Sequence, residues 1–413
     1  MKSSSMWIRT RAARGFTLLE VMIASAIGLI VLGAGLVAAM QMQRRSQFEE
    51  QTMQAQTTGR VVMELLAADL QRAGTGMGNA PITFSDTRIQ TPIQVWTEAD
   101  LSAADVTRPF LADANFALPP PGHLEEFRSD VLQIHWGDTR GMVTMAPCGG
   151  GNSGPTRSGP QGFCTTANPS TRLQPLTAPS TPAFVVNPGA NFACHVRVTN
   201  VDTGGLSVTA DPGFGTEATT TGRCATPNDG AWNLDTQAPE RTTWRIMQAQ
   251  SAAYRVNWAS GTPTLEYLGP DAVDWVVLSR HVEQLKVRFG VMSHVPPLGF
   301  RWFPDEAAGL PAIDACTTTT CPIDQHPDAS LEAGPPADDE ELRRRLRQRI
   351  REVEVKLVVR TPRPDRDAFD PAEPIRLDKE DFPIDGFKRR TYTFRAMLRN
   401  FAAGGLQPPL VGE

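Results

Sequence analysis

One acidic residue lies near the start of the most apolar stretch of this sequence. Glu20 follows Gly15-Phe16-Thr17-Leu18-Leu19, and an apolar run interrupted by Ser25 continues from it to Met40. A carboxylate at membrane depth costs about 2.5–3.5 kcal/mol on insertion scales. Each Leu, Ile, Val or Phe returns about 0.3–0.6 kcal/mol, so the run can carry Glu20 into a membrane. Anchoring alone gives no reason for the carboxylate to be there.

A basic segment precedes the apolar run and would remain on the cytoplasmic side of a membrane. Its cations are Lys2, Arg9, Arg11 and Arg14. At ~1.5 Å per residue, the ~20 apolar residues span the ~30 Å hydrocarbon core of a bilayer. An ordinary secretory signal would end in a small-residue cleavage site, but Gln41-Met42-Gln43-Arg44-Arg45 follows the run instead. We therefore expect the apolar helix to stay with the protein.

The segment Gly15-Phe16-Thr17-Leu18-Leu19-Glu20 resembles the prepilin processing motif of type IV pilins and of type II secretion pseudopilins. In that family a prepilin peptidase cuts between the glycine and the phenylalanine on the cytoplasmic side, and it methylates the new amino terminus. The resemblance implies cleavage between Gly15 and Phe16, N-methylation of Phe16, and a mature chain in which Glu20 is the fifth residue.

A filament core would give Glu20 a physical role. A charge that is buried there has to be paired, and the nearest available cation is the amino terminus of Phe16 on a neighbouring subunit. Two unit charges ~4 Å apart attract by ~4 kcal/mol at an effective dielectric of ~20, which is comparable with the insertion penalty. We therefore expect Glu20 to set the register between subunits. A glutamate that reaches up to the membrane interface is the plainer alternative.

The element that positions these residues is a long helix. No proline interrupts the chain from Phe16 to Ala73, and Gly74-Thr75-Gly76-Met77-Gly78 ends it. In its second half Val62, Leu66 and Leu70 recur at four-residue spacing, with Val61 and Leu65 beside them, against Glu64, Asp69, Gln71 and Arg72. This half is expected to pack on a sheet.

The remainder of the chain is β-rich. The predicted strands are 131–136, 196–198, 244–249, 254–258, 282–291 and 351–360. In the last of these Val353, Val355, Leu357 and Val359 alternate with polar residues. Long stretches rich in Pro, Gly, Thr, Asn and Asp separate them and are expected to be loops: 74–128, 146–192, 211–240 and 293–340.

These elements predict an α+β fold, in which a long N-terminal helix packs on an antiparallel β-sheet that carries long loop insertions, as in pilins. The predicted divisions are a leader at 1–15, a transmembrane and filament-core helix at 16–40, an amphipathic spine helix at 41–73 and a periplasmic or extracellular β-rich domain at 74–413. Three later segments, 282–291, 353–361 and 389–400, together with 69–74, are similar to PilW-type minor pilins. The cysteine-bearing loops lie outside that resemblance, and the chain is long for the family.

Six cysteines follow residue 147, hence beyond the membrane if the leader is cytoplasmic. An even number in an oxidising compartment favours disulfides. Cys316 and Cys321 form the best candidate pair because the loop between them is short. The other four cysteines allow three pairings, and sequence proximity alone suggests Cys148 with Cys164 and Cys194 with Cys224. Zinc-finger spacings do not occur, so no metal is expected.

Enzyme and nucleic-acid functions find little support. The histidines are scattered without a catalytic or zinc motif, so neither an enzyme nor a cofactor is expected: His123, His135, His195, His281, His294 and His326. A helix over 339–350 carries the arginine cluster Arg343, Arg344, Arg345, Arg347, Arg349 and Arg351. We expect Leu342, Leu346 and Ile350 to be its buried stripe and the arginines its solvated face. The formal net charge of −5 also argues against nucleic-acid binding.

The sequence therefore predicts a minor pilin of a type IV pilus. It would enter the inner membrane as a single-pass protein with a cytoplasmic amino terminus, be processed, and join other pilin subunits through its helix, priming assembly or lying near the tip. A minor pseudopilin of a type II secretion system is the closest alternative. A membrane-anchored, adhesin-like binding module that uses the loops is the alternative of another class.

Overall fold

The computed structural model describes residues 17–403, apart from some loop positions. These are 87, 103–110, 121–127, 168, 170, 176–179, 189–191, 203, 215–216, 226–231, 235–242, 271, 273, 295–298, 326–333, 366–375 and 380–381. The chain forms two compact units, Met1–Gln54 and Ala55–Glu413. The expected α+β arrangement, a long apolar helix followed by a mostly β domain, is confirmed.

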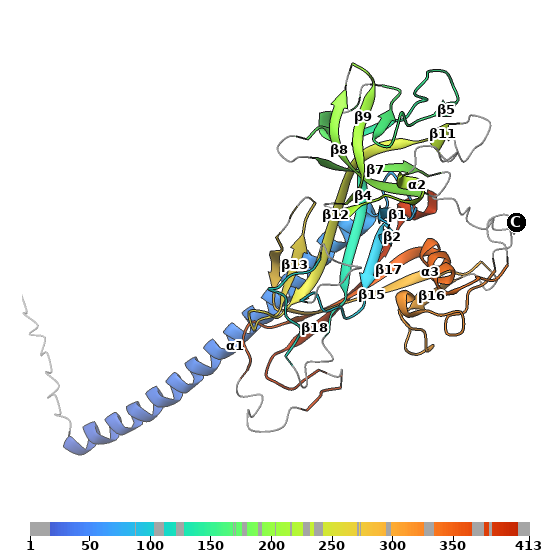
Figure 1. Ribbon diagram of the computed structural model, residues 1–413. Helices are drawn as coiled ribbons and strands as arrows, with labels where there is room; N and C mark the ends of the chain where they lie inside the picture. Colours follow the sequence, from blue (N-terminus) through green and yellow to red (C-terminus); the bar gives the residue numbers. More distant parts are fainter. Residues whose placement is uncertain are drawn as a thin grey trace, which may run out of the picture. The chain divides into compact units, whose positions relative to one another are not determined.

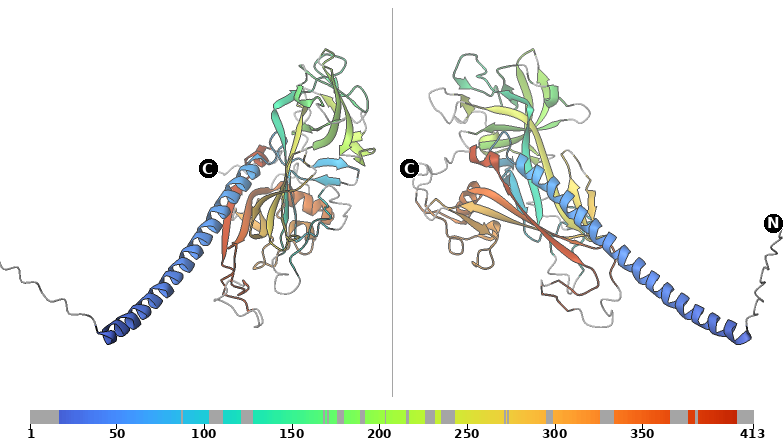
Figure 2. Two further views of the ribbon diagram at one scale, coloured as in Figure 1. Left: turned by 90° about the vertical axis from the view of Figure 1, so that its left-hand side faces the viewer. Right: turned by 180° about the vertical axis from the view of Figure 1, so that it is seen from behind.

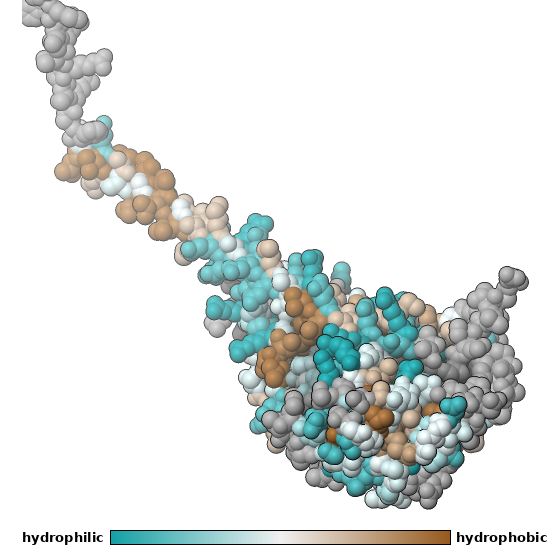
Figure 3. Space-filling view, turned by 90° about the horizontal axis from the view of Figure 1, so that it is seen from above, coloured by the Kyte–Doolittle hydropathy of each residue, from teal (hydrophilic) through white to brown (hydrophobic). Residues whose placement is uncertain are grey.

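Helix α1 (Leu18–Arg72) is continuous over 55 residues. All its residues from Leu18 to Met40 are exposed, and Figure 3 shows the hydrophobic colouring gathered along this part of the helix. The helix ends where the sequence predicts. Gly74 adopts a φ of 69°, which favours glycine, and its N–H donates to the carbonyl of His135 at 3.0 Å.

The last turns of α1 bury one face. Val62, Leu66 and Leu70 are at most 3% exposed, as the four-residue spacing predicts, and Ala55 and Gly59 extend this face. An added Cβ at Gly59 would lie 2.4 Å from the ring of Tyr392, so glycine permits this close approach.

Asp69 departs from the expected pattern. Its side chain was assigned to the polar face, but it is only 6% exposed. It accepts a 2.5 Å hydrogen bond from the hydroxyl of Tyr254 and pairs with Arg72 at 3.1 Å. Burial, followed by the hydrogen bond to Asp69, raises the pKa of Tyr254, so its hydroxyl remains a donor. The carboxylate is buried because the sheet supplies the partner that the helix alone lacks.

The described strands form three sheets, and Figure 1 labels many of these strands. The largest contains β1 (Ile82–Ser85), β2 (Arg88–Gln90), β3 (Ile93–Trp96), β4 (Val131–Thr144), β6 (Gly162–Cys164), β7 (Thr181–Asn187), β8 (Phe192–Asp202), β9 (Ser207–Phe214), β10 (Glu217–Ala218), β12 (Arg245–Asn257), β13 (Thr264–Leu268) and β14 (Val276–Arg280). A second has the order β16 (Phe300–Phe303), β15 (Val282–Met292), β17 (Ile350–Arg360), β18 (Arg389–Met397). The third pairs β5 (Gly154–Pro155) with β11 (Asn233–Leu234). The short helices are η2 (Thr171–Leu173), α2 (Gly222–Ala225), η5 (Ile313–Ala315), α3 (Asp339–Gln348) and η6 (Arg399–Ala403).

Pairing within the sheets is antiparallel except between β1 and β8, which run parallel. The two strands predicted at 244–249 and 254–258 are one continuous strand, β12. Several stretches expected to be loops contain strands: β1 to β3 lie within 74–128, β5 to β7 within 146–192 and β16 within 293–340. Most of these strands are short, so their alternation was hidden in the sequence. β7 was missed although it is seven residues long and contains Ala183-Phe184-Val185-Val186.

One hydrophobic cluster joins α1 to both large sheets. It contains Leu66 and Leu70 of α1, Leu132 of β4, Val287 of β15 and Val355 of β17, all at most 2% exposed. Figure 2 shows the Arg72 end of α1 lying along these strands. The spine predicted from the amphipathic pattern therefore packs on two sheets rather than one.

Helix α3 begins at Asp339, as the sequence predicts, and ends at Gln348. The side chain of Asp338 accepts a hydrogen bond from the Glu341 N–H at 2.8 Å, and Leu342 and Leu346 are buried. The expectation that the arginines form a solvated face is wrong for Arg345, Arg349 and Arg351, which are 5%, 1% and 9% exposed. They are buried because neighbouring backbone supplies acceptors; Arg349 donates to the carbonyl of Asp324 at 2.7 Å.

The Tyr254–Asp69 bond gives the first prediction. Tyr254→Phe should lower the free energy of unfolding by about 1–3 kcal/mol, because the buried carboxylate loses its hydroxyl donor. Urea titration followed by tryptophan fluorescence measures this. Tyr267→Phe is the matched control, since its ring lies 5.3 Å from that of Tyr254 without a hydrogen bond to Asp69. Equal losses in both variants would contradict the assignment.

Candidate functional site

The amino terminus of α1 is closed by a reciprocal pair of hydrogen bonds. The Glu20 N–H donates to Oγ1 of Thr17 at 3.3 Å, and the Thr17 N–H donates to Oε2 of Glu20 at 3.1 Å. This is a capping box, in which two backbone donors that lack helical partners are satisfied together. The Thr17 hydroxyl also donates to the same oxygen at 3.1 Å.

This capping box gives Glu20 a role that the sequence interpretation missed. The spacing Thr-x-x-Glu before an apolar run is its signal, and it was available in the sequence. The carboxylate of Glu20 accepts both of its hydrogen bonds, from the N–H and the hydroxyl of Thr17, through Oε2, and Oε1 has no hydrogen-bond partner among the described residues. Gly15 and Phe16, the expected processing site, lie outside the described residues.

Helix α1 contains a stretch that is long and apolar enough to cross a membrane, judged by length and composition. It is the one such helix in the part of the chain that the structure describes. Every side chain in this window is exposed, so the residues that the structure describes leave it without apolar cover.

Three disulfides hold the β domain together. They join Cys148 to Cys164, Cys194 to Cys224 and Cys316 to Cys321, the same partners that sequence proximity suggested. The loops that they close span 16, 30 and 5 residues. In the chain-entropy model such loops stabilise a fold by about 2–4 kcal/mol each. Their role here is structural.

Two histidines described as scattered in the sequence meet in the large sheet. The ring of Phe84 lies 5.0 Å from that of His135 and 5.2 Å from that of His195. Strands β1, β4 and β8 supply them, and no sequence signal relates these three strands. His281 and His294 lie elsewhere, while His123 and His326 fall outside the described residues.

Both rings are held neutral. Burial lowers the pKa of His135 to about 3 and, with a smaller opposing effect from its backbone hydrogen bond, that of His195 to about 4. Nδ1 of His195 lies 2.7 Å from the carbonyl oxygen of Gly213, to which the neutral ring donates. His195 therefore presents Nε2 as an acceptor.

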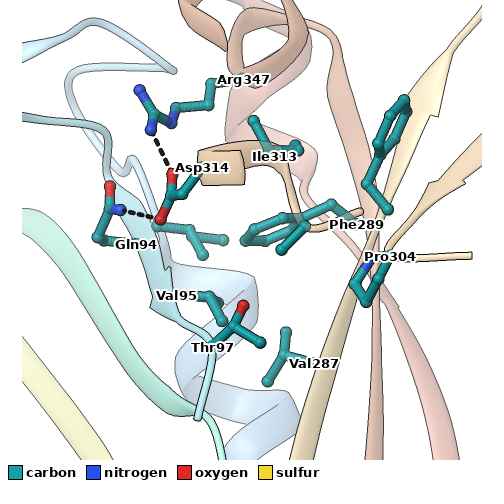
Figure 4. Close-up of a pocket in the computed structure, with 12 residues that line it drawn as sticks. Gln94, Val95, Thr97, Val287, Phe289, Pro304, Ile313, Asp314 and Arg347 are labelled. Carbon is teal, nitrogen blue, oxygen red and sulfur yellow. Dashed lines mark hydrogen bonds and ion pairs between the residues drawn. The ribbon is translucent and has the colours of Figure 1, made fainter. Parts of the chain in front are cut away.

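A small cavity beside β3 and β15 has a structural role. Asp314 accepts a hydrogen bond from Nε2 of Gln94 at 3.2 Å and pairs with Arg347 (Figure 4). The space, about 10 Å³, matches a single water molecule rather than a ligand. Asp314 thus ties η5 and α3 to the edge of β3. Among the described residues, no group of three His, Cys, Asp or Glu side chains could hold a metal ion.

A long exposed apolar helix followed by a disulfide-bonded, mostly β domain is the α+β, pilin-like arrangement. Residues 10–36 match the model of the prokaryotic N-terminal methylation motif, the type IV prepilin-like signal. This motif indicates a type IV pilin-like or pseudopilin protein, and the proteins of the motif family are structural subunits. The similarity to PilW-type minor pilins stays a prediction.

Comparison with curated proteins and with solved structures finds no match to the chain.

The buried histidines predict a pH dependence of stability. In the unfolded chain these histidines have a pKa near 6.5 and become protonated between pH 7 and 5. In the folded protein their pKa values are about 3 and 4, so the rings stay neutral over this range. Stability is therefore fully present above pH 6.5 and falls as the pH is lowered. The loss at pH 5 should be about 2 kcal/mol per histidine.

Urea titrations at pH 7 and pH 5 measure this loss. His135→Phe should remove about half of the contribution from the two rings, while carboxylates with lowered pKa values titrate below this window. An unchanged pH dependence in His135→Phe would show that the ring is not the source.

Proposed function

We propose that this protein is a minor pilin of a type IV pilus, which enters the inner membrane and is then built into the filament. The observation that carries the proposal is the joint presence of the methylation motif at residues 10–36 and an apolar half of α1 whose side chains lack cover. Lipid covers that surface before assembly, and the helices of other pilin subunits cover it afterwards.

The proposed divisions of the chain follow from this role. Residues 1–15 are the leader, which prepilin peptidase removes in the cytoplasm. Residues 16–40 cross the membrane and enter the filament core, 41–73 form the spine, and 74–413 form the periplasmic domain that reaches the cell surface in the pilus. The basic flank of the leader supports a cytoplasmic amino terminus.

Glu20 is proposed to act twice in this pathway. In the membrane, its Oε2 closes the helix through Thr17. In the filament, its Oε1 accepts a hydrogen bond from the methylated amino terminus of a neighbouring subunit. The capping box supports this second role because it fixes the carboxylate at the helix start while one oxygen has no protein partner among the described residues.

A priming or tip position suits the shape of the domain. The β domain combines a branched twelve-stranded sheet with a second sheet and three disulfide-bonded loops. Such a broad domain fits poorly into the repeated shaft of a thin filament, where each subunit is surrounded by copies. At an end, the same domain has room and can contact major and minor pilins through its helix.

Processing can be tested at Gly15. Gly15→Val should leave a precursor that keeps the first 15 residues, because a side chain is placed next to the cleaved bond. Mass spectrometry of the membrane-extracted protein measures the amino terminus and looks for methyl-Phe16. Gly33→Val is the matched control, since an added Cβ there meets open space. A normally trimmed Gly15→Val protein would refute the processing assignment.

The two roles of Glu20 can be separated. Glu20→Gln keeps an acceptor for the capping box and removes the charge, whereas Thr17→Ala keeps the charge and removes the cap. If ~4 kcal/mol of attraction fixes the register, Glu20→Gln should lower incorporation into sheared pili at least tenfold, and Thr17→Ala should not. Immunoblots of pili and membranes give the ratio. Equal incorporation of Glu20→Gln and wild type would remove the pairing argument.

A further inference from the structure

A cavity lies where the large sheet divides. β12 pairs with β7 from Arg245 to Gln248 and with β13 from Ala253 to Asn257. Because β4 pairs with β12 from Arg245 to Tyr254, β7 and β13 both lie on the opposite side of β12. Between them, the strand from Ala249 to Ala252 pairs with β4 alone among the described residues. This gap is about 13 Å long at the rise of a β-strand.

Small side chains on β12 leave space beside the gap. Ser251 is opposite His135 and Ala253 is opposite Gln133, and partners directly across an antiparallel pair share one face of a sheet. The resulting cavity is about 370 Å³, within the range of small-molecule sites, which is about 300–1,000 Å³. Phe84 is among the apolar residues that line it.

Two buried polar atoms at this cavity lack protein partners. Gln133 is 3% exposed and His135 is 2% exposed. Neither Oε1 of Gln133 nor Nε2 of His135 has a hydrogen-bond partner among the residues that the structure describes. Buried polar side chains in proteins are nearly always bonded. A ligand in the cavity would supply what these two atoms lack.

The walls of the cavity carry no formal charge. Its described lining contains no Asp, Glu, Lys or Arg, and burial keeps His135 and His195 neutral. The described lining thus offers a charged ligand no counter-ion, and burying an unpaired charge is costly. Arg88 and Arg197, which contribute to lowering the pKa of His195, are near that ring but outside the lining. The uncharged lining therefore favours a neutral occupant that donates hydrogen bonds to acceptors such as Gln133 Oε1 and places apolar surface against Phe84 and Phe184.

We propose that this cavity binds a neutral sugar ring, either free or as the terminal residue of a glycan. The hydroxyl groups of a sugar ring would donate hydrogen bonds to the acceptors, and the C–H faces of the same ring would pack against the aromatic side chains. An extended peptide that adds a strand to the free edge of β12 would be the competing occupant. It would satisfy the edge but leave Gln133 and His135, which belong to the face of the sheet, without partners.

The test uses the full chain in lipid nanodiscs, because many detergents carry sugar head groups. Saturation-transfer NMR is recorded with glucose, galactose, N-acetylglucosamine and N-acetylgalactosamine. Glucuronic acid and glucosamine serve as charged rings of similar size. An oligosaccharide that carries the bound sugar at its non-reducing end, compared with one that carries it internally, separates the free and glycan sources.

Binding of at least one neutral sugar is expected. Ser251→Leu, which fills the cavity, should weaken it at least tenfold, and Gln133→Leu should weaken it about fivefold through the lost acceptor. His294→Phe, a buried histidine that does not line the cavity, should bind as the wild type does. Near-ultraviolet circular dichroism shows whether each variant is folded. If Ser251→Leu does not fold, sugar binding by Gln133→Leu is the test of the proposal.

The proposal is overturned if no neutral sugar binds, if the charged rings bind as well, or if binding survives in folded Ser251→Leu and Gln133→Leu. It is also overturned if only an extended hexapeptide binds. Processing at Gly15 and incorporation through Glu20 are measured in separate experiments. The sugar-binding proposal can therefore fail while the pilin proposal stands, and the reverse.

Discussion

The central constraint on this protein is that the two halves of one helix bury their apolar surfaces in different ways. From Ala55 to Arg72, α1 buries its apolar face against two sheets, and the hydrophobic effect is satisfied within the chain. From Leu18 to Met40 the helix is almost entirely apolar, and no described part of the chain covers it. A helix that is apolar all around requires a membrane or other helices. Its sequence therefore commits the molecule to partners before any site is considered.

Glu20 shows how a carboxylate is tolerated at the start of such a helix. The four N–H groups at a helix start lack partners, and in hydrocarbon each unsatisfied group is costly. Oε2 of Glu20 accepts a hydrogen bond from the Thr17 N–H, and Oγ1 of Thr17 accepts one from the Glu20 N–H, which reduces that cost. Capping explains why a polar residue stands there, and glutamine would serve equally well. The negative charge itself remains unexplained by the single chain, and a cation on another subunit would explain it.

Local patterns predicted the helix, its glycine terminus and strand β17, because these depend on periodicity and on residues close in sequence. The disulfide partners suggested by proximity also agree with the structure. The failures involve long-range contacts. In the sequence, Asp69 and Arg349 look like surface residues. Both are buried because distant residues supply their partners: the Tyr254 hydroxyl bonds to Asp69, and the Asp324 carbonyl accepts from Arg349. His135 and His195 lie close together because of the order of strands in the sheet, and no spacing in the sequence reveals that order.

The same long-range topology creates the cavity on β12. A strand of 13 residues is longer than either of its neighbours on one side, and a twisted sheet carries β7 and β13 apart. A continuous core would fill such a gap with large side chains, yet β12 places Ala249, Ser251 and Ala253 there. Close packing is the default of protein interiors. Space that is open beside two buried polar atoms, which have no partners among the described residues, is better explained by a ligand than by a packing defect.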